Sequence, residues 1–213
     1  MERAVQGGRN WNSASIWLLY FVALLPAGWE FYLGVTDNLG ADPVKTFERF
    51  LGLWAIRFLI LTLVISPIRN VLGINLIRYR RALGLTCFYY VLMHFSVYAL
   101  LDQELAVHAI VADIAKRPFI MLGATGLVLL VPLAVTSNAN SIRRLGKHWL
   151  QLHRLIYAIA ICGAIHLFLA TKILSIEQWL YLALLTLSIL HRCIRPFTKR
   201  QRLVNTAAVK GWS

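Results

Sequence analysis

The sequence predicts an all-α integral membrane protein, a bundle of six transmembrane helices with both termini in the cytoplasm. Three observations lead to this prediction. Hydrophobic residues make up 59% of the 213 residues and charged residues only 15%, whereas a soluble domain holds about a quarter charged residues. The apolar residues gather in runs long enough to cross a bilayer. The 22 Lys and Arg, against 9 Asp and Glu, are divided unevenly between the two sides of these runs. This composition excludes a soluble globular domain and a nucleic-acid-binding arm.

Six apolar runs account for the expected helices, because about 20 mostly apolar residues cross the hydrocarbon core of a bilayer. No A-x-A cleavage site follows the first run, which is therefore interpreted as a retained helix rather than a signal peptide. The chain then divides into a cytoplasmic segment 1–14, a six-helix domain 15–191 and a basic cytoplasmic tail 192–213. The six runs are Ser15–Leu33, Phe50–Ile65, Leu83–Leu101, Phe119–Val135, Leu155–Ala170 and Leu174–Leu190.

The loop charges orient the predicted bundle. Sixteen of the Lys and Arg fall on the side of the two termini and five on the opposite side, which also holds eight of the nine acids. Cytoplasmic loops of membrane proteins carry an excess of Lys and Arg, so both termini are placed in the cytoplasm and the acidic loops outside. Most of the basic surplus is expected to follow this rule and to attract anionic membrane lipid. A docking surface for a cytosolic partner or a cofactor phosphate is the alternative.

Two histidines inside predicted spans are the leading candidates for function, because ionisable groups in a bilayer are costly. His94 lies 11 residues after Leu83 and His166 lies 11 residues after Leu155. Both helices enter from the cytoplasm, so both imidazoles lie about 16 Å along their helices. Matched depth on parallel helices is what a b-type haem with two axial histidines requires. The alternative is that each histidine only hydrogen-bonds to a neighbouring helix.

A second cluster of polar residues is expected near the cytoplasmic face. His153 precedes His166 by 13 residues, which places it about 20 Å lower and out of reach of the same iron. Basic residues at this level suit an anionic cofactor, either the propionates of a second haem or the phosphate of FMN. The alternative is that His153 only caps its helix at a wet interface. The basic residues are Arg80, Arg81 and Lys147.

Arg57 lies near the centre of the second predicted span and needs an anionic partner there. A haem propionate, a flavin phosphate or a carboxylate would serve, and snorkelling to an interface is the alternative. The sequence contains no GxGxxG after a strand, no P-loop and no CxxCH, so a nucleotide-binding domain and a covalently attached haem are not expected. Any electrons must therefore come from quinol or from a separate reductase.

Several short motifs together resemble the MsrQ family of haem-binding membrane subunits, which belongs with the ferric-reductase-like transmembrane proteins. The resemblance runs from about residue 15 to residue 190, and the GADPVK and LGK-x-W-x-x-LH elements are specific in combination. The motifs are Gly40–Lys45 (GADPVK), Arg80–Leu85 (RRALGL), Leu92–His94 (LMH), Tyr98–Leu101 (YALL), Arg117-Pro118, Leu145–His153 (LGKHWLQLH) and Ile165-His166.

The resemblance implies an electron-transfer subunit rather than a catalytic one. Members of the family pass electrons across the bacterial inner membrane to MsrP, a periplasmic molybdopterin enzyme that reduces methionine sulfoxide in oxidised envelope proteins. It also implies one or two b-type haems and FMN, supplied from the quinone pool or a cytosolic flavin reductase. The haem-ligating histidines of the family fall on His94, His153 and His166. The wider superfamily often carries two histidines on each of the third and fifth spans, and here the third span has one.

Two other functions stay open on the residues alone. A stand-alone membrane cytochrome could act as a ferric or quinone reductase without a protein partner. A transporter or scaffold with incidental histidines would have no redox role, and a haem absorption band that shifts on reduction would exclude it.

Overall fold

The computed structural model describes the backbone of residues 2–210 and the side chains of residues 14–192 and 194. Over this part of the chain all regular structure is helical, which confirms the predicted all-α class. The helices are α1 (Glu2–Val35), α2 (Pro43–Val71), η1 (Ile77–Tyr79), α3 (Arg80–Val97), η2 (Tyr98–Asp102), α4 (Val107–Lys116), α5 (Pro118–Val135), α6 (Ala139–Leu145), α7 (Lys147–Leu152), α8 (Leu155–Ala170) and α9 (Ile176–Lys210).

Five helical segments within the described residues are long and apolar enough to cross a membrane, and they contain the first five predicted runs. They are Ala14–Val35, Pro43–Val71, Ile77–Asp102, Pro118–Val135 and Lys147–Ala170. The sixth run, Leu174–Leu190, falls almost entirely in α9 but is not among these five. The sixth span and the cytoplasmic termini therefore stay predictions. Most side chains of segments 1–14 and 192–213 lie outside the described residues.

Local capping chemistry explains where two of the long helices begin. The Asp42 carboxylate precedes α2 and accepts a hydrogen bond from the backbone N–H of Lys45 at 3.0 Å. Pro43 and Pro118 occupy the first turns of α2 and α5, where a missing N–H costs nothing and the fixed φ favours the helix. Because of its cap, α2 begins seven residues before the apolar run Phe50–Ile65 that marks it in the sequence.

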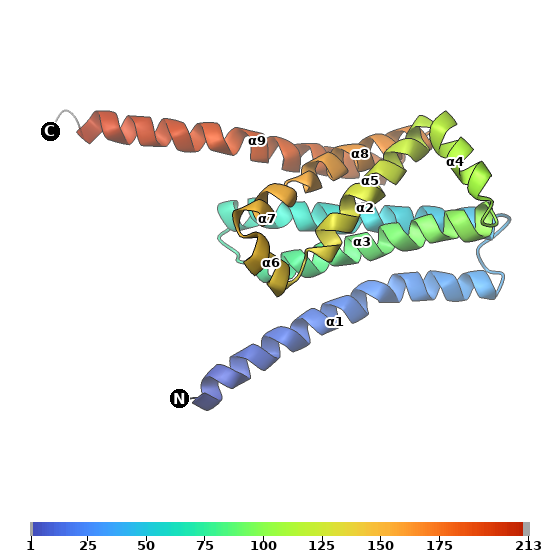
Figure 1. The fold of residues 1–213 in the computed structure, drawn as a ribbon, viewed down its shortest axis with the longest axis horizontal. Coiled ribbons are helices and arrows are strands. Elements are labelled where there is room, and N and C mark those ends of the chain that lie inside the picture. Colours follow the sequence, from blue (N-terminus) through green and yellow to red (C-terminus); the bar gives the residue numbers. More distant parts are fainter. Residues whose placement is uncertain (1, 211–213) are drawn as a thin grey trace.

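Two helix pairs form the centre of the bundle: α2 packs most extensively against α3, and α5 against α8. In Figure 1, α1 runs along one side of these pairs and α9 along the opposite side, where it extends beyond them. Tyr90 of α3 is fully buried, and its hydroxyl donates to the Ala23 carbonyl of α1 at 2.7 Å. Large apolar side chains such as Trp17 and Ile176 are exposed on the outer faces, as expected for surfaces that contact lipid.

The two ends of the bundle differ in what they carry. We call the end where α2 and α5 begin and α3 and α8 finish the histidine end, because His94 and His166 lie near it. We call the opposite end, where α3 begins with Arg80 and Arg81, the arginine end. The short helices α6 and α7 lie at the arginine end (Figure 1).

Candidate functional site

A cavity of about 820 Å³ lies between the two helix pairs toward the histidine end. Its volume is in the range of sites that bind small molecules and cofactors, and such sites are mostly apolar with a few converging polar groups. This cavity follows that pattern, since aliphatic side chains from four helices surround a small number of polar ones. His94 and His166 both line it.

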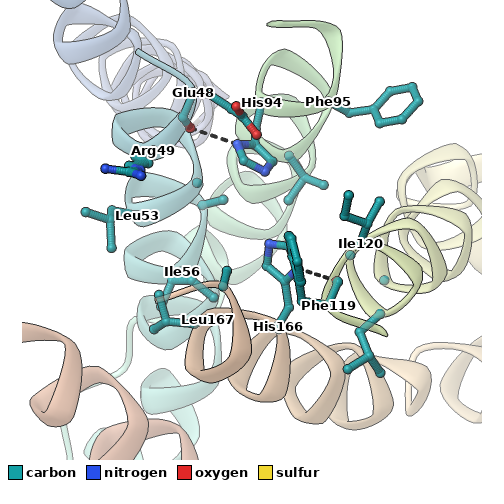
Figure 2. Close-up of a pocket in the computed structure, with 18 of the residues that line it drawn as sticks. Glu48, Arg49, Leu53, Ile56, His94, Phe95, Phe119, Ile120, His166 and Leu167 are labelled. Atoms are coloured by element: carbon teal, nitrogen blue, oxygen red, sulfur yellow. Dashed lines mark hydrogen bonds between the residues drawn. The ribbon is translucent and has the colours of Figure 1, made fainter. Parts of the chain in front are cut away.

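The two histidines face each other across the cavity. Their ring centroids are 6.2 Å apart and their planes are inclined at 79°. Two imidazoles that bind one metal ion through bonds of about 2 Å each hold their centroids roughly 6 Å apart, once the ring radii are added. The structure thus brings together the two histidines that were paired by their matched depth (Figure 2). Their separation fits a single iron between them.

Each histidine is held by a backbone carbonyl from the neighbouring helix of its pair. His94 Nδ1 lies 2.8 Å from the Glu48 carbonyl oxygen, and His166 Nδ1 lies 2.6 Å from the Phe119 carbonyl oxygen (dashed in Figure 2). A carbonyl can only accept, so each Nδ1 carries the hydrogen and donates it. In neutral imidazole this leaves the lone pair on Nε2, and a hydrogen bond of this kind at the far nitrogen is what orients most metal-binding histidines.

A glycine makes room for each ring, four residues after the carbonyl that the ring contacts. A Cβ on Gly52 would lie 3.2 Å from His94 Nδ1, and a Cβ on Gly123 would lie 3.0 Å from His166 Nδ1. Both distances are tighter than ordinary van der Waals contact, so any larger residue would push the ring aside. Neither glycine was predicted from the sequence as part of the site. The available signal was a glycine inside an apolar helix, where it costs stability unless packing requires it.

His153 does not line this cavity. It follows α7, and its ring stacks on Trp149 with centroids 3.8 Å apart and planes inclined at 25°. Its Nδ1 lies 3.1 Å from the Trp149 carbonyl oxygen, and its Nε2 lies 3.5 Å from Ser137 Oγ. The structure therefore separates His153 from the histidine pair, and a role for it as a haem ligand stays a prediction.

Arg57 also lies outside the cavity lining, and protein groups satisfy its charge. One of its terminal nitrogens is 2.7 Å from a Glu177 carboxylate oxygen, and Nε donates to the Tyr181 hydroxyl at 2.6 Å. The guanidinium also sits over the Trp54 ring, 4.6 Å from its centroid, in a cation–π contact. These groups connect α2 to α9. A contact between Arg57 and a cofactor stays a prediction.

The predicted basic cluster lies at the arginine end, away from the histidine pair. Arg80 and Arg81 begin α3 and Lys147 begins α7, and none of the three lines the cavity. Arg81 and Lys147 are exposed, whereas Arg80 is partly buried. This placement agrees with a surface that faces lipid headgroups or a soluble partner, and a cofactor phosphate there stays a prediction.

Comparison with known proteins decides the family of this chain. The family described as "Ferric reductase like transmembrane component" matches residues 51–164, just over half of the chain. A relative from Rhizobium meliloti (strain 1021) is 55% identical over 199 residues, which cover 93% of this chain and 92% of the relative. A relative from Brucella anthropi is 54% identical over 190 residues, covering 89% and 86%. Both bear the name "Protein-methionine-sulfoxide reductase heme-binding subunit MsrQ".

The chain belongs to the MsrQ family. A third relative, from Brucella ovis, has the same name and is 55% identical over 188 residues, covering 88% of this chain and 85% of the relative. Membership of this family and the apolar helices together make the chain a multi-pass membrane protein. No solved structure matches it.

Proposed function

We propose that this MsrQ-family chain is the haem-binding membrane subunit of a methionine sulfoxide reductase system, with His94 and His166 as the axial ligands of a b-type haem. One observation above all supports the proposal: two imidazoles 6.2 Å apart in one cavity, each with Nδ1 engaged by a backbone carbonyl. When bound, the haem would supply reversible one-electron chemistry between the ferric and ferrous states.

The residues of this chain hold and shield that chemistry rather than take part in bond breaking. The carbonyls of Glu48 and Phe119 fix the orientation of the two rings and raise their basicity as ligands. Leu59, Leu130 and Leu167 line the cavity with apolar surface and would shield the iron where they lie. Two histidines held in place on either side of the iron would leave no open position on it, which suits electron transfer rather than binding of a substrate at the metal.

The proposed path of the electrons runs from the arginine end of the bundle to the histidine end. The charge asymmetry of the loops would place the histidine end at the outer face of the bacterial inner membrane, next to a periplasmic molybdopterin enzyme like MsrP. Electrons would enter at the arginine end from the quinone pool or from a cytosolic flavin reductase. We further propose that FMN or a second haem lies there beside His153, with Arg80, Arg81 and Lys147 binding its anionic groups.

A reconstituted vesicle assay tests this function. Purified protein in liposomes should show a low-spin haem spectrum, and a donor enclosed in the lumen should reduce the haem. Adding an oxidised MsrP-like enzyme outside should reoxidise it faster than a ferric chelate does. A stand-alone ferric reductase would give the opposite order of acceptors. A chain with no haem, or with a haem that neither acceptor reoxidises, would refute electron transfer through this site.

The same assay tests the role of His153. A His153→Ala variant should keep the haem between His94 and His166 with an unchanged spectrum, but luminal flavin or quinol should reduce that haem more slowly. Unchanged reduction kinetics with full cofactor content would leave His153 with a structural role only.

A further inference from the structure

Four cationic side chains line the cavity at the histidine end: Lys45, Arg49, Arg117 and Lys172. Acidic residues neutralise two of them. Lys45 Nζ is 2.7 Å from an Asp102 carboxylate oxygen and 3.4 Å from one of Glu48, and Arg117 Nε is 3.3 Å from one of Asp113. Within the described residues, Arg49 and Lys172 form no ion pair. The cavity therefore presents two cations that no acidic side chain among residues 14–192 pairs with.

These two cations come from elements that meet at the same end of the bundle. Arg49 lies in the second turn of α2, and Lys172 follows directly after α8, which finishes at Ala170. Both side chains are exposed, so the cavity opens toward solvent or headgroups where they line it. An anionic group seated in the cavity would meet both charges there without having to displace an internal carboxylate.

The histidine pair dictates how a flat ligand would lie in the cavity. A macrocycle bound between two axial imidazoles extends sideways from the line that joins them. Figure 2 shows Arg49 and Leu53 to one side of the His94–His166 pair and Phe95 to the other, with Ile120 also on the Phe95 side. Arg49 thus offers positive charge on one side of the pair, and Phe95 and Ile120 offer apolar surface on the other.

We propose that Arg49 and Lys172 bind the two propionate carboxylates of the haem, and that the edge without propionates packs toward Phe95 and Ile120. This inference rests on the proposed haem function. Two carboxylates match these two cations, and charge-assisted hydrogen bonds are about twice as strong as neutral ones. The pairing fixes the rotation of the haem about the axis between the histidines and directs the propionate edge to the open side of the cavity.

The pairing also has a predictable effect on the redox potential. Positive charge beside the carboxylates offsets their negative charge and so favours the ferrous form over the more positive ferric form. Removing either cation should therefore lower the midpoint potential, and it should also weaken haem retention, with transfer to apomyoglobin about tenfold faster for each lost charge-assisted contact.

The test uses the full chain, produced without haem, purified in detergent and loaded with either haem or haem dimethyl ester, whose propionates are uncharged. The variants are Arg49→Gln, Lys172→Gln and the double variant, with Arg49→Lys and Lys172→Arg as charge-conserving controls. Lys116→Gln is the matched control, because Lys116 is an exposed cation at the same end that does not line the cavity. The readouts are the midpoint potential and the rate of haem transfer to apomyoglobin.

With ordinary haem, the Gln variants should show a lower potential and faster transfer, and all control variants should match the unaltered chain. With the dimethyl ester, the Gln variants should lose haem no faster than the unaltered chain, and the difference in midpoint potential should shrink. The proposal is overturned if the Gln variants match the unaltered chain with ordinary haem. It is equally overturned if their faster haem transfer persists with the ester, which would mean that the cations bind something else, such as lipid phosphate. Failure of the unaltered chain to bind low-spin haem would instead refute the proposed function.

Discussion

The two halves of the candidate site are built alike from unlike sequences. The α2–α3 half-site consists of the Glu48 carbonyl, Gly52 and His94, and the α5–α8 half-site consists of the Phe119 carbonyl, Gly123 and His166. In both, a carbonyl accepts from the histidine Nδ1, and a glycine four residues later makes room for the ring.

The half-sites differ in how tightly they hold the ring and in what surrounds it. The α5–α8 half-site has the shorter hydrogen bond, 2.6 Å against 2.8 Å, and the closer glycine, 3.0 Å against 3.2 Å. The Phe119 ring, 6.2 Å from the His166 ring between centroids, adds apolar cover there. In the other half-site, the carbonyl belongs to an acidic residue that pairs with Lys45. A carboxylate-bearing residue thus holds the His94 ring, whereas an aromatic residue holds the His166 ring.

The largest expected effect is an unequal loss of haem when each of the two histidines is replaced. A His166→Ala variant should lose nearly all haem, because the aromatic ring of Phe119 beside the vacated position cannot replace the ligand. A His94→Ala variant should keep part of its haem as a five-coordinate or water-ligated high-spin form, since this side borders polar groups. Haem-to-protein ratio and the visible and EPR spectra measure both effects. Full low-spin haem in either variant would show that the ligand pair is assigned incorrectly.

Replacing the glycine of either half-site should have the next largest effect on haem binding. Gly123→Ala should lower low-spin haem content more than Gly52→Ala, because the added Cβ lies closer to its histidine ring. The matched control is Gly84→Ala on α3, whose Cβ would be 3.8 Å from Thr62 Cγ2, an ordinary contact.

A helical Gly→Ala change otherwise stabilises by up to about 1 kcal/mol. The haem-free Gly84→Ala variant should therefore unfold no more easily than the unaltered chain. Equal haem binding by all three glycine variants would contradict the role given to Gly52 and Gly123.

Removing the negative charge of Glu48, next to His94, should have the smallest effect, a shift in the midpoint potential of the haem. Glu48→Gln keeps the carbonyl that holds His94 but removes a carboxylate that lines the cavity. Losing negative charge disfavours the ferric form, so the midpoint potential should rise. Because Lys45 already offsets this carboxylate, the rise should stay below about 60 mV, the one-electron equivalent of a tenfold change. Redox titration measures it, with Glu104→Gln in an exposed loop as the control; a fall in potential would contradict the assignment.

The sequence predicted those parts of the fold and site that depend on spacing along one helix. The run Leu155–Ala170 coincides with α8, because apolar residues fill that helix from end to end. The closeness of His94 and His166 could be predicted because both lie 11 residues into helices that run in the same direction, and the rise per residue is constant. The start of α2 was placed too late because its first turns carry Lys45, Glu48 and Arg49, and the Asp42 cap rather than an apolar run defines where it begins.

Features that depend on which backbones meet in space could not be predicted from spacing. A carbonyl acceptor can come from any residue type, so neither Glu48 nor Phe119 carried a sequence signal for its contact with a histidine. The partner of Arg57 was equally hidden, because Glu177 lies 120 residues further along the chain. The stack of His153 on Trp149 differs from these contacts, because it joins residues four apart on one helical stretch. That spacing places side chains on one face of a helix, so this contact could have been predicted.

The pairing of Arg57 with Glu177 has a consequence for how the chain enters the membrane during synthesis. An arginine at the centre of a lone helix opposes insertion by about 2.5–3.5 kcal/mol. The 120 residues that separate the two partners take on the order of 10 s to translate. During that interval Trp54, one turn away, offers its ring to the guanidinium in place of the missing carboxylate. We therefore expect stable integration of α2 to be completed only after Glu177 has been synthesised.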